Sequence, residues 1–123
     1  MVARRGGGSL IATSSRSVRT GAARNEHYGA TKGAVISVIQ GLAIEYARHF
    51  ICANAILPGW VATEMTARNQ ESEKFNANVI SRVPARRWGE PEDFGGVAIY
   101  LTSDASSFHS GDTFLIDGGY AIY

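Results

Sequence analysis

The fold is decided by residues 15–32, which read Ser-Arg-Ser-Val-Arg-Thr-Gly-Ala-Ala-Arg-Asn-Glu-His-Tyr-Gly-Ala-Thr-Lys. Tyr28 and Lys32 are four positions apart, so on a helix the phenol and the ammonium share one face, one turn from each other. A free tyrosine titrates at about 10, and a neighbouring cation favours the phenolate and lowers that pKa. This is one way to make a tyrosine a general acid or base. It is also common where a tyrosine packs at the rim of a core and the lysine is solvated.

A short apolar run leads into this stretch. Residues 9–15 read Ser-Leu-Ile-Ala-Thr-Ser-Ser, which predicts a buried strand over 10–13 followed by a loop. Ser15 would then lie at the carboxyl end of the strand, where open α/β sheets place their ligands. A serine at a strand end can equally be a turn or cap residue. Together, Ser15, Tyr28 and Lys32 form a candidate catalytic triple, because one strand and one helix start must supply all three.

The pattern from residue 26 to residue 49 is helical, with apolar side chains recurring every three or four positions. A second side of the same helix is also small or apolar. A helix that is apolar on two faces is expected to be covered on both of them. We therefore expect one face to cover a sheet and the other to form a subunit interface. The two sets are Tyr28, Thr31, Val35, Val38, Leu42 and Tyr46, and Gly33, Ala34, Ile36, Ile39, Gly41, Ala43 and Ala47.

Two further strands are expected downstream. The nearly continuous apolar run 51–57 is typical of a strand in a parallel sheet covered on both faces, and Pro58-Gly59 ends it. Thr63 is placed to cap a following helix. Residues 64–83 predict two short helices on a mobile flap of the kind that covers substrates. Residues 113–116 form the last strand, which gives an α/β fold with a three-stranded, mostly parallel sheet flanked by helices.

Composition narrows the function classes. The 123 residues suit a single domain, and a net charge of +1 gives no field strong enough to recruit nucleic acid or a membrane surface. No apolar run approaches the roughly twenty residues of a membrane span. The single cysteine, Cys52, excludes an internal disulfide and gives no thiolate cage, so no metal site is expected. The lone His109 is expected at the surface. The default location is the cytoplasm.

Five ordered segments of the chain resemble the short-chain dehydrogenase/reductase family. They cover nearly the whole chain. They are Ser14-Ser15 with Tyr28-Gly-Ala-Thr-Lys32-Gly-Ala-Val35, then Asn54-Ala-Ile-Leu-Pro58-Gly59-Trp-Val61-Ala-Thr63, Gly89-Glu-Pro91-Glu-Asp93, Tyr100-Leu-Thr-Ser-Asp104-Ala-Ser-Ser, and Ile116-Asp117-Gly118-Gly119-Tyr120.

The resemblance implies an NAD- or NADP-dependent oxidoreductase that interconverts a secondary alcohol and a carbonyl in a small molecule. Tyr28 would exchange the proton with the substrate oxygen, and Ser15 would hydrogen-bond that oxygen. Lys32 would lower the pKa of the tyrosine and touch the nicotinamide ribose. Other cofactor contacts would come from Pro58, Gly59, Val61 and Thr63. The resemblance also implies a homo-oligomer through helix 26–49 and a substrate lid at 64–83. Within the family, residues 54–60 and 116–120 look most like the corresponding segments of sugar-acid dehydrogenases or oxoacyl reductases.

The family's dinucleotide fingerprint has no counterpart, because no Gly-x-Gly-x-x-Gly occurs in the sequence. The resemblance therefore makes residues 1–123 the carboxyl-terminal half of such a domain, a partial Rossmann sheet with its last three strands. We expect this chain alone to lack a surface for adenosine and pyrophosphate, and the edge of strand 10–13 to promote association. The alternative is a truncated, non-catalytic domain that self-associates or binds a partner. The sequence does not distinguish NAD from NADP or identify a substrate.

Overall fold

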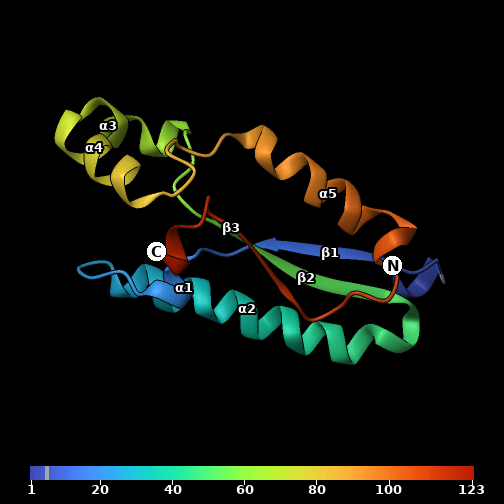
Figure 1. The fold of residues 1–123 in the computed structure, drawn as a ribbon. Coiled ribbons are helices and arrows are strands. Elements are labelled where there is room, and N and C mark those ends of the chain that lie inside the picture. The colour runs from blue at the N-terminus through green and yellow to red at the C-terminus, as the bar shows by residue number, and fades with distance from the viewer. Residues whose placement is uncertain (5) are drawn as a thin grey trace.

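The computed structural model describes residues 1–4 and 6–123, and these form an α/β fold (Figure 1). Its centre is a three-stranded sheet in the order β1-β2-β3. The strands are β1 (Gly8–Thr13), β2 (Ile51–Pro58) and β3 (Thr113–Ile116). Both pairings are parallel, with Gly8 opposite Ile51 and Ala55 opposite Thr113. The expected α/β class is confirmed, and all three carboxyl ends point the same way.

Helices cover both faces of this sheet (Figure 1). One face carries α1 (Ser17–Thr20) and α2 (Glu26–Tyr46), and the other carries α5 (Gly95–Thr102). The expected flap contains α3 (Ala67–Glu71) and α4 (Glu73–Arg82), which lie beyond the carboxyl ends of the strands. Single 3-10 turns complete the chain at Val2–Arg4, Ala47–His49, Glu64–Thr66, Pro91–Phe94, Asp104–Ser106 and Tyr120–Ile122.

The long helix ends earlier than its periodicity predicts. Regular α-helix stops at Tyr46, and the 3-10 turn Ala47–His49 continues the predicted element to residue 49. Phe50 then takes a left-handed conformation with φ of 57°, and its N–H donates to the carbonyl of Ala47 at 2.9 Å. This conformation turns the chain directly into β2. It has no local sequence signal, because glycine usually occupies such a position.

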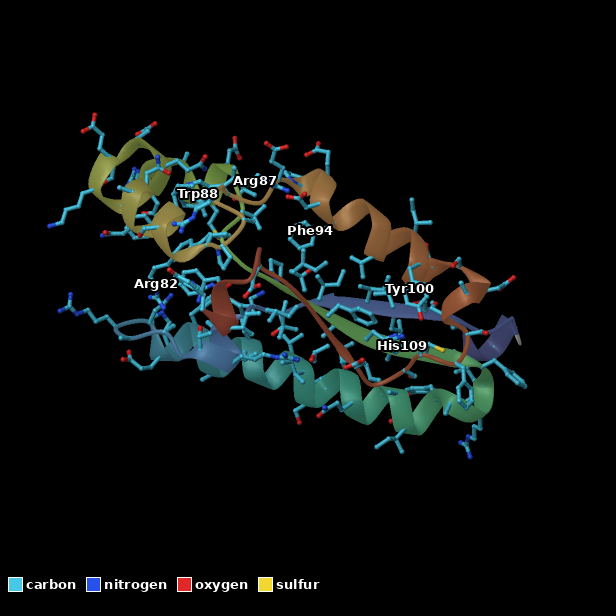
Figure 2. All side chains as sticks on the ribbon, in the orientation of Figure 1. Arg82, Arg87, Trp88, Phe94, Tyr100 and His109 are labelled. Carbon is cyan, nitrogen blue, oxygen red and sulfur yellow. The ribbon has the colours of Figure 1, made fainter. Side chains whose placement is uncertain are left out.

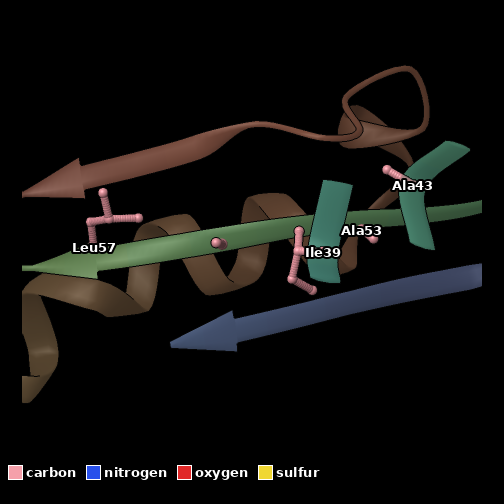
Figure 3. Packing of buried hydrophobic residues seen from close by; sticks show 5 residues of the cluster. Ile39, Ala43, Ala53 and Leu57 are labelled. Atoms are coloured by element: carbon pink, nitrogen blue, oxygen red, sulfur yellow. The ribbon is translucent and has the colours of Figure 1, made fainter. Parts of the chain in front are cut away.

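The main core lies between α2 and β2 (Figure 3). Ala53, Ala55 and Leu57 alternate along the strand and have no solvent-exposed surface, and they pack against Ile39 and Ala43 of the helix. The two alanines of the strand allow the helix to approach the sheet closely. On α2, Val38 and Ile44 remain 59% and 81% exposed. The helix thus buries one apolar face and leaves a second one uncovered.

A second cluster anchors the flap to the C-terminal turn. Val79, Val83 and Tyr120 are buried there, with Trp60 packed against them. Trp88 joins the cluster, and its indole N–H donates to Asn76 Oδ1 of α4 at 2.6 Å. Residues 64–83 therefore have a core of their own, which fixes the base of the flap.

His109 differs from its expected place at the surface. Its side chain is only 32% exposed, with Nδ1 2.9 Å from the hydroxyl of Tyr100 and Nε2 2.9 Å from Asp112 (Figure 2). Asn54, which is fully buried, donates to the carbonyl of His109 at 2.7 Å. The loop that enters β3 is thus tied to β2 by polar contacts, which the lone position of His109 in the sequence does not reveal.

β1 forms an open edge of the sheet. Within the part of the chain that the structure describes, β1 pairs with β2 alone, so its outer side carries unpaired backbone groups. Ile11 of this strand is 37% exposed. Among the described helices, none has the length and apolar character needed to cross a membrane.

A pH-dependent ion pair holds the loop before α5. Arg87 donates to both oxygens of Asp93, at 2.6 and 2.7 Å, and the N–H of Glu90 donates to the same carboxylate at 2.8 Å. The hydrogen bonds from Arg87 lower the pKa of Asp93 from 3.8 to about 2. A carboxylate whose folded pKa is depressed stabilises the fold above its unfolded pKa, and that contribution is lost as the pH falls through the folded pKa.

We therefore expect Asp93→Asn to lower the melting temperature at neutral pH, and the difference from wild type to shrink as the pH falls from 3.8 toward 2. Thermal unfolding followed by circular dichroism across this range measures the effect. Glu92→Gln removes a neighbouring carboxylate from the same turn and serves as the control. A difference between Asp93→Asn and wild type that stays constant with pH would contradict the assignment.

Candidate active site

A cleft of about 1240 Å³ opens at the carboxyl ends of β1 and β2. Its walls come from the loop after β1, the first turns of α2, the segment after β2 and the flap. This is the position at which open α/β sheets bind ligands. The structure brings together all of the site residues expected from the sequence, which are Ser15, Tyr28, Lys32, Pro58, Gly59, Val61 and Thr63.

Two crossed hydrogen bonds fix α2 to the end of β1. The ammonium of Lys32 donates to the carbonyl of Thr13 at 3.0 Å, and the hydroxyl of Ser14 donates to the carbonyl of Lys32 at 2.8 Å. Ser14 is only 2% exposed, so this contact is shielded from water. Both bonds meet at one helical residue. They set the rotation and the height of the helix relative to the strand.

Tyr28 lies one helical turn before this connection. Its ring centroid is 5.8 Å from the ammonium of Lys32, and the side chain is half-buried at the cleft. In residues 1–4 and 6–123, no hydrogen bond engages the hydroxyl of Tyr28. The phenol is therefore available to a ligand oxygen, with a fixed cation close to its ring.

The hydroxyl of Ser15 has a donor available for a ligand. The side chain is 9% exposed, and its oxygen accepts a hydrogen bond from the N–H of Ser17 at 3.2 Å. A hydroxyl offers one donor and two acceptor positions, so this contact leaves the O–H unused. The serine thus makes the turn expected of a strand-end residue and still has a donor to offer in the cleft.

The segment after β2 is held in place by the C-terminal turn. The N–H of Gly59 donates to the carbonyl of Ile116 at 2.9 Å, and a Cβ at Gly59 would lie 2.6 Å from the Cβ of Asp117. Only glycine permits this approach. Farther along, the hydroxyl of Thr66 accepts from the N–H of Thr63 at 3.0 Å and donates to the carbonyl of Val61 at 2.7 Å. Thr63 therefore begins a capped turn and also lines the cleft.

Sequence reasoning did not identify four further residues of the cleft. The guanidinium of Arg16 lies 3.9 Å from the ring centroid of Tyr120 and 5.1 Å from that of Trp60, and Arg82 lies 4.4 Å from Tyr120. Burial lowers the pKa of Arg16 below its ordinary value. Its position directly after Ser15 was the one available signal. The contacts join four distant segments of the chain, so no local pattern shows them.

Comparison with known proteins identifies the class to which this fold and site belong. The family described as enoyl-(acyl carrier protein) reductase matches residues 1–121. The 5-keto-D-gluconate 5-reductase of Escherichia coli (strain K12) is 44% identical over 95 residues, which make up 77% of this chain and 37% of the relative. The chain belongs to the short-chain dehydrogenase/reductase family.

Solved structures agree with this assignment. A short-chain type dehydrogenase/reductase from Mycobacterium ulcerans superposes with a TM-score of 0.92 at 34% identity, covering 98% of this chain and 44% of that one. A gluconate 5-dehydrogenase from Burkholderia cenocepacia J2315, in complex with NADP and tartrate, gives 0.89 at 36% identity and covers 99% and 48%. The chain spans less than half the length of each of these three relatives.

The buried hydroxyl of Ser14 provides a test of the connection between β1 and α2. We expect Ser14→Ala to lower the free energy of unfolding by about 1 kcal/mol, because it removes one shielded hydrogen bond. Denaturant unfolding measures the change. Ser37→Ala, on the exposed side of α2, is the matched control and should change stability much less. Equal effects of the two substitutions would show that the bond contributes nothing specific.

Proposed function

We propose that this chain carries the proton-transfer and substrate-binding part of an NAD(P)-dependent oxidoreductase that interconverts a secondary alcohol and a carbonyl. The observation that carries the proposal is the convergence of Ser15, Tyr28 and Lys32 on one cleft at the carboxyl ends of the strands. Membership of the family supports the reaction class.

In the oxidation direction, the oxygen of Tyr28 accepts the proton of the substrate hydroxyl. The hydroxyl of Ser15 donates a hydrogen bond to the same substrate oxygen and holds it in position. The ammonium of Lys32, fixed by Thr13, favours the charged phenolate through its positive charge. A nicotinamide cofactor held in the cleft would supply the hydride acceptor for this reaction, and the hydride donor for its reverse. The proton thus moves through Tyr28, while Ser15 and Lys32 keep their own.

The residues present suit the nicotinamide end of such a cofactor. An ammonium has three donors, and Lys32 uses one on Thr13, so two remain for ribose hydroxyls. The other wall would be Pro58, Gly59, Val61 and Thr63, which line the same cleft. The described residues offer no glycine-rich phosphate loop, since the sequence holds no Gly-x-Gly-x-x-Gly. Both NAD and NADP remain candidates.

The substrate we propose is a small sugar acid or its keto form. Relatives named for 5-keto-D-gluconate and gluconate support this class, and the Burkholderia cenocepacia structure holds tartrate, a dicarboxylate. No group of three or more His, Cys, Asp or Glu side chains in the described part of the chain is arranged to hold a metal ion. The cytoplasmic location stays a prediction.

We also propose that a second copy of the chain packs on the outer face of α2. Val38 and Ile44 are exposed on that side, and a Cβ added at Gly33 or Gly41 would meet nothing within 4 Å. Small residues beside exposed aliphatic ones allow two helices to approach closely and exclude water between them. The open edge of β1 is a further surface for association.

The first test replaces Tyr28 by Phe, which removes the phenolic oxygen and keeps the ring. We expect turnover of a secondary alcohol, followed by NAD(P)H absorbance, to fall by about a hundredfold or more, because the proton acceptor is lost. The test is made in a protein that contains this chain and binds NADH or NADPH, and calorimetry should give the variant the same cofactor affinity as the wild type. Tyr46→Phe on the same helix is the matched control and should leave turnover unchanged. Full turnover by the Tyr28 variant would reject the mechanism.

The second test concerns association. Ile44→Glu places a charge on the exposed apolar face of α2, and we expect it to convert an oligomer into a smaller species, because burying an unpaired carboxylate is unfavourable. Size-exclusion chromatography with light scattering measures the mass. Ala77→Glu adds the same charge at an exposed position of α4, on another element, and should not change the mass. A wild-type monomer would reject this interface.

A further inference from the structure

Two arginines from distant segments share one aromatic ring at the flap end of the cleft. Arg16 follows Ser15, and Arg82 is the last residue of α4. Their guanidinium carbons lie 3.9 and 4.4 Å from the ring centroid of Tyr120 in the C-terminal turn. Figure 2 shows Arg82 reaching from α4 toward this turn. All three side chains line the cleft that holds Tyr28.

Neither cation of this pair forms an ion pair with a residue that the structure describes. The ion pairs within residues 1–4 and 6–123 join Arg87 to Asp93 and His109 to Asp112, so neither Arg16 nor Arg82 is in one. Asp117 is the acid that acts on Arg16, but its two oxygens accept the N–H groups of Gly119 and Ala121, at 2.9 and 2.8 Å. Arg16 is half-buried and Arg82 is exposed, and two like charges that stack on one ring repel each other unless an anion compensates them.

Most of the donors at this site are unused. A guanidinium has five N–H donors, and Arg16 donates to the hydroxyl of Thr20 at 3.0 Å. Two neighbouring polar atoms, Ser17 Oγ and Trp60 Nε1, are buried and have no hydrogen-bond partner among the described residues, and both side chains line the cleft. Unsatisfied buried polar groups are rare in folded proteins. These two atoms are closed to solvent, so the donors left for a ligand with several acceptor oxygens are those of the two guanidinium groups.

We propose that Arg16 and Arg82 bind the carboxylate of the substrate, so that the chain selects acidic over neutral polyols. The planar guanidinium fork matches the two oxygens of a carboxylate. Tyr120 keeps both forks in the cleft by stacking, and Arg16 lies next to Ser15 in the chain. The carboxylate is therefore held at the flap end, while the reacting carbon lies toward Tyr28. The position of the reacting carbon rests on the proposed function, whereas the binding of the carboxylate by the two arginines does not depend on it.

The test measures binding without cofactor. The purified full chain is titrated by calorimetry with D-gluconate and with sorbitol, a neutral polyol of the same length. We expect gluconate to bind and sorbitol to bind at least about tenfold more weakly. Arg16→Gln and Arg82→Gln should each raise the Kd for gluconate by about tenfold, as loss of a charged hydrogen bond does. Arg16→Lys should recover part of the affinity.

Arg48→Gln, at the far end of α2, removes the same charge and should leave the Kd unchanged. Because Arg16 is half-buried, circular dichroism checks that its variants fold. If they do not fold, the Kd of the Arg82→Gln variant provides the test, because Arg82 is exposed. Equal binding of gluconate and sorbitol, no binding of gluconate to the folded wild type, or unchanged affinity in the folded variants would overturn the proposal. Tighter binding of inorganic phosphate or pyrophosphate, lost in the same variants, would reassign the site to a phosphate.

Steady-state turnover distinguishes the carboxylate site from the proposed oxidoreductase activity. Selective gluconate binding that depends on Arg16 and Arg82, without NAD(P)-dependent turnover, would support the carboxylate site and reject the oxidoreductase. Turnover of gluconate with an unchanged KM in both variants would support the oxidoreductase and overturn the carboxylate site. A raised KM with little change in kcat supports both.

Discussion

The geometry of the cleft depends on the crossed hydrogen bonds between the end of β1 and Lys32. The lysine ammonium reaches back to the carbonyl of Thr13, and Ser14 reaches forward to the lysine carbonyl. Since both bonds end on one residue of α2, the helix can neither rotate nor slide without breaking one of them. Tyr28 is one turn earlier on the same helix, so its position relative to Ser15 follows from this connection. The lysine therefore combines two tasks, because its charge faces the phenol while one of its donors holds the backbone.

A second constraint brings the far wall of the cleft into place. The close approach of Gly59 to Asp117 allows the end of β2 and the C-terminal turn to lie side by side. Gly118 takes a left-handed conformation with φ of 63°, and a Cβ there would lie 2.8 Å from Val83. The turn is thereby pressed against the base of the flap, and Tyr120 is buried between them. Glycines that look like simple turn residues in the sequence thus determine how closely the flap packs on the sheet.

The sequence predicted the fold class and the residues that meet at the cleft, because both depend on local spacing. Tyr28 and Lys32 are one helical turn apart, and the apolar runs over 10–13 and 51–57 mark the strands. The residues that sequence reasoning missed depend instead on contacts between distant segments. Nothing near Tyr120 indicates that Arg16 and Arg82 stack on it. The turn after residue 49 was also not predicted, because Phe50 adopts a left-handed conformation without the glycine that usually signals one.

Under the proposed function and the proposed carboxylate site, the two walls of the cleft separate chemistry from recognition. The wall that carries Tyr28 and Lys32 is fixed by the main core and by contacts between regular elements. The opposite wall, formed by the flap, is built on a smaller cluster around Val79, Val83 and Tyr120. Changes in α3 or α4 can therefore alter which substrate is held without moving Tyr28. Arg16 is the exception, since its backbone N–H donates to the carbonyl of Pro58 at 3.1 Å and its side chain stacks against the flap wall. Of the cleft residues, it is the one through which a change in substrate recognition would also disturb Ser15.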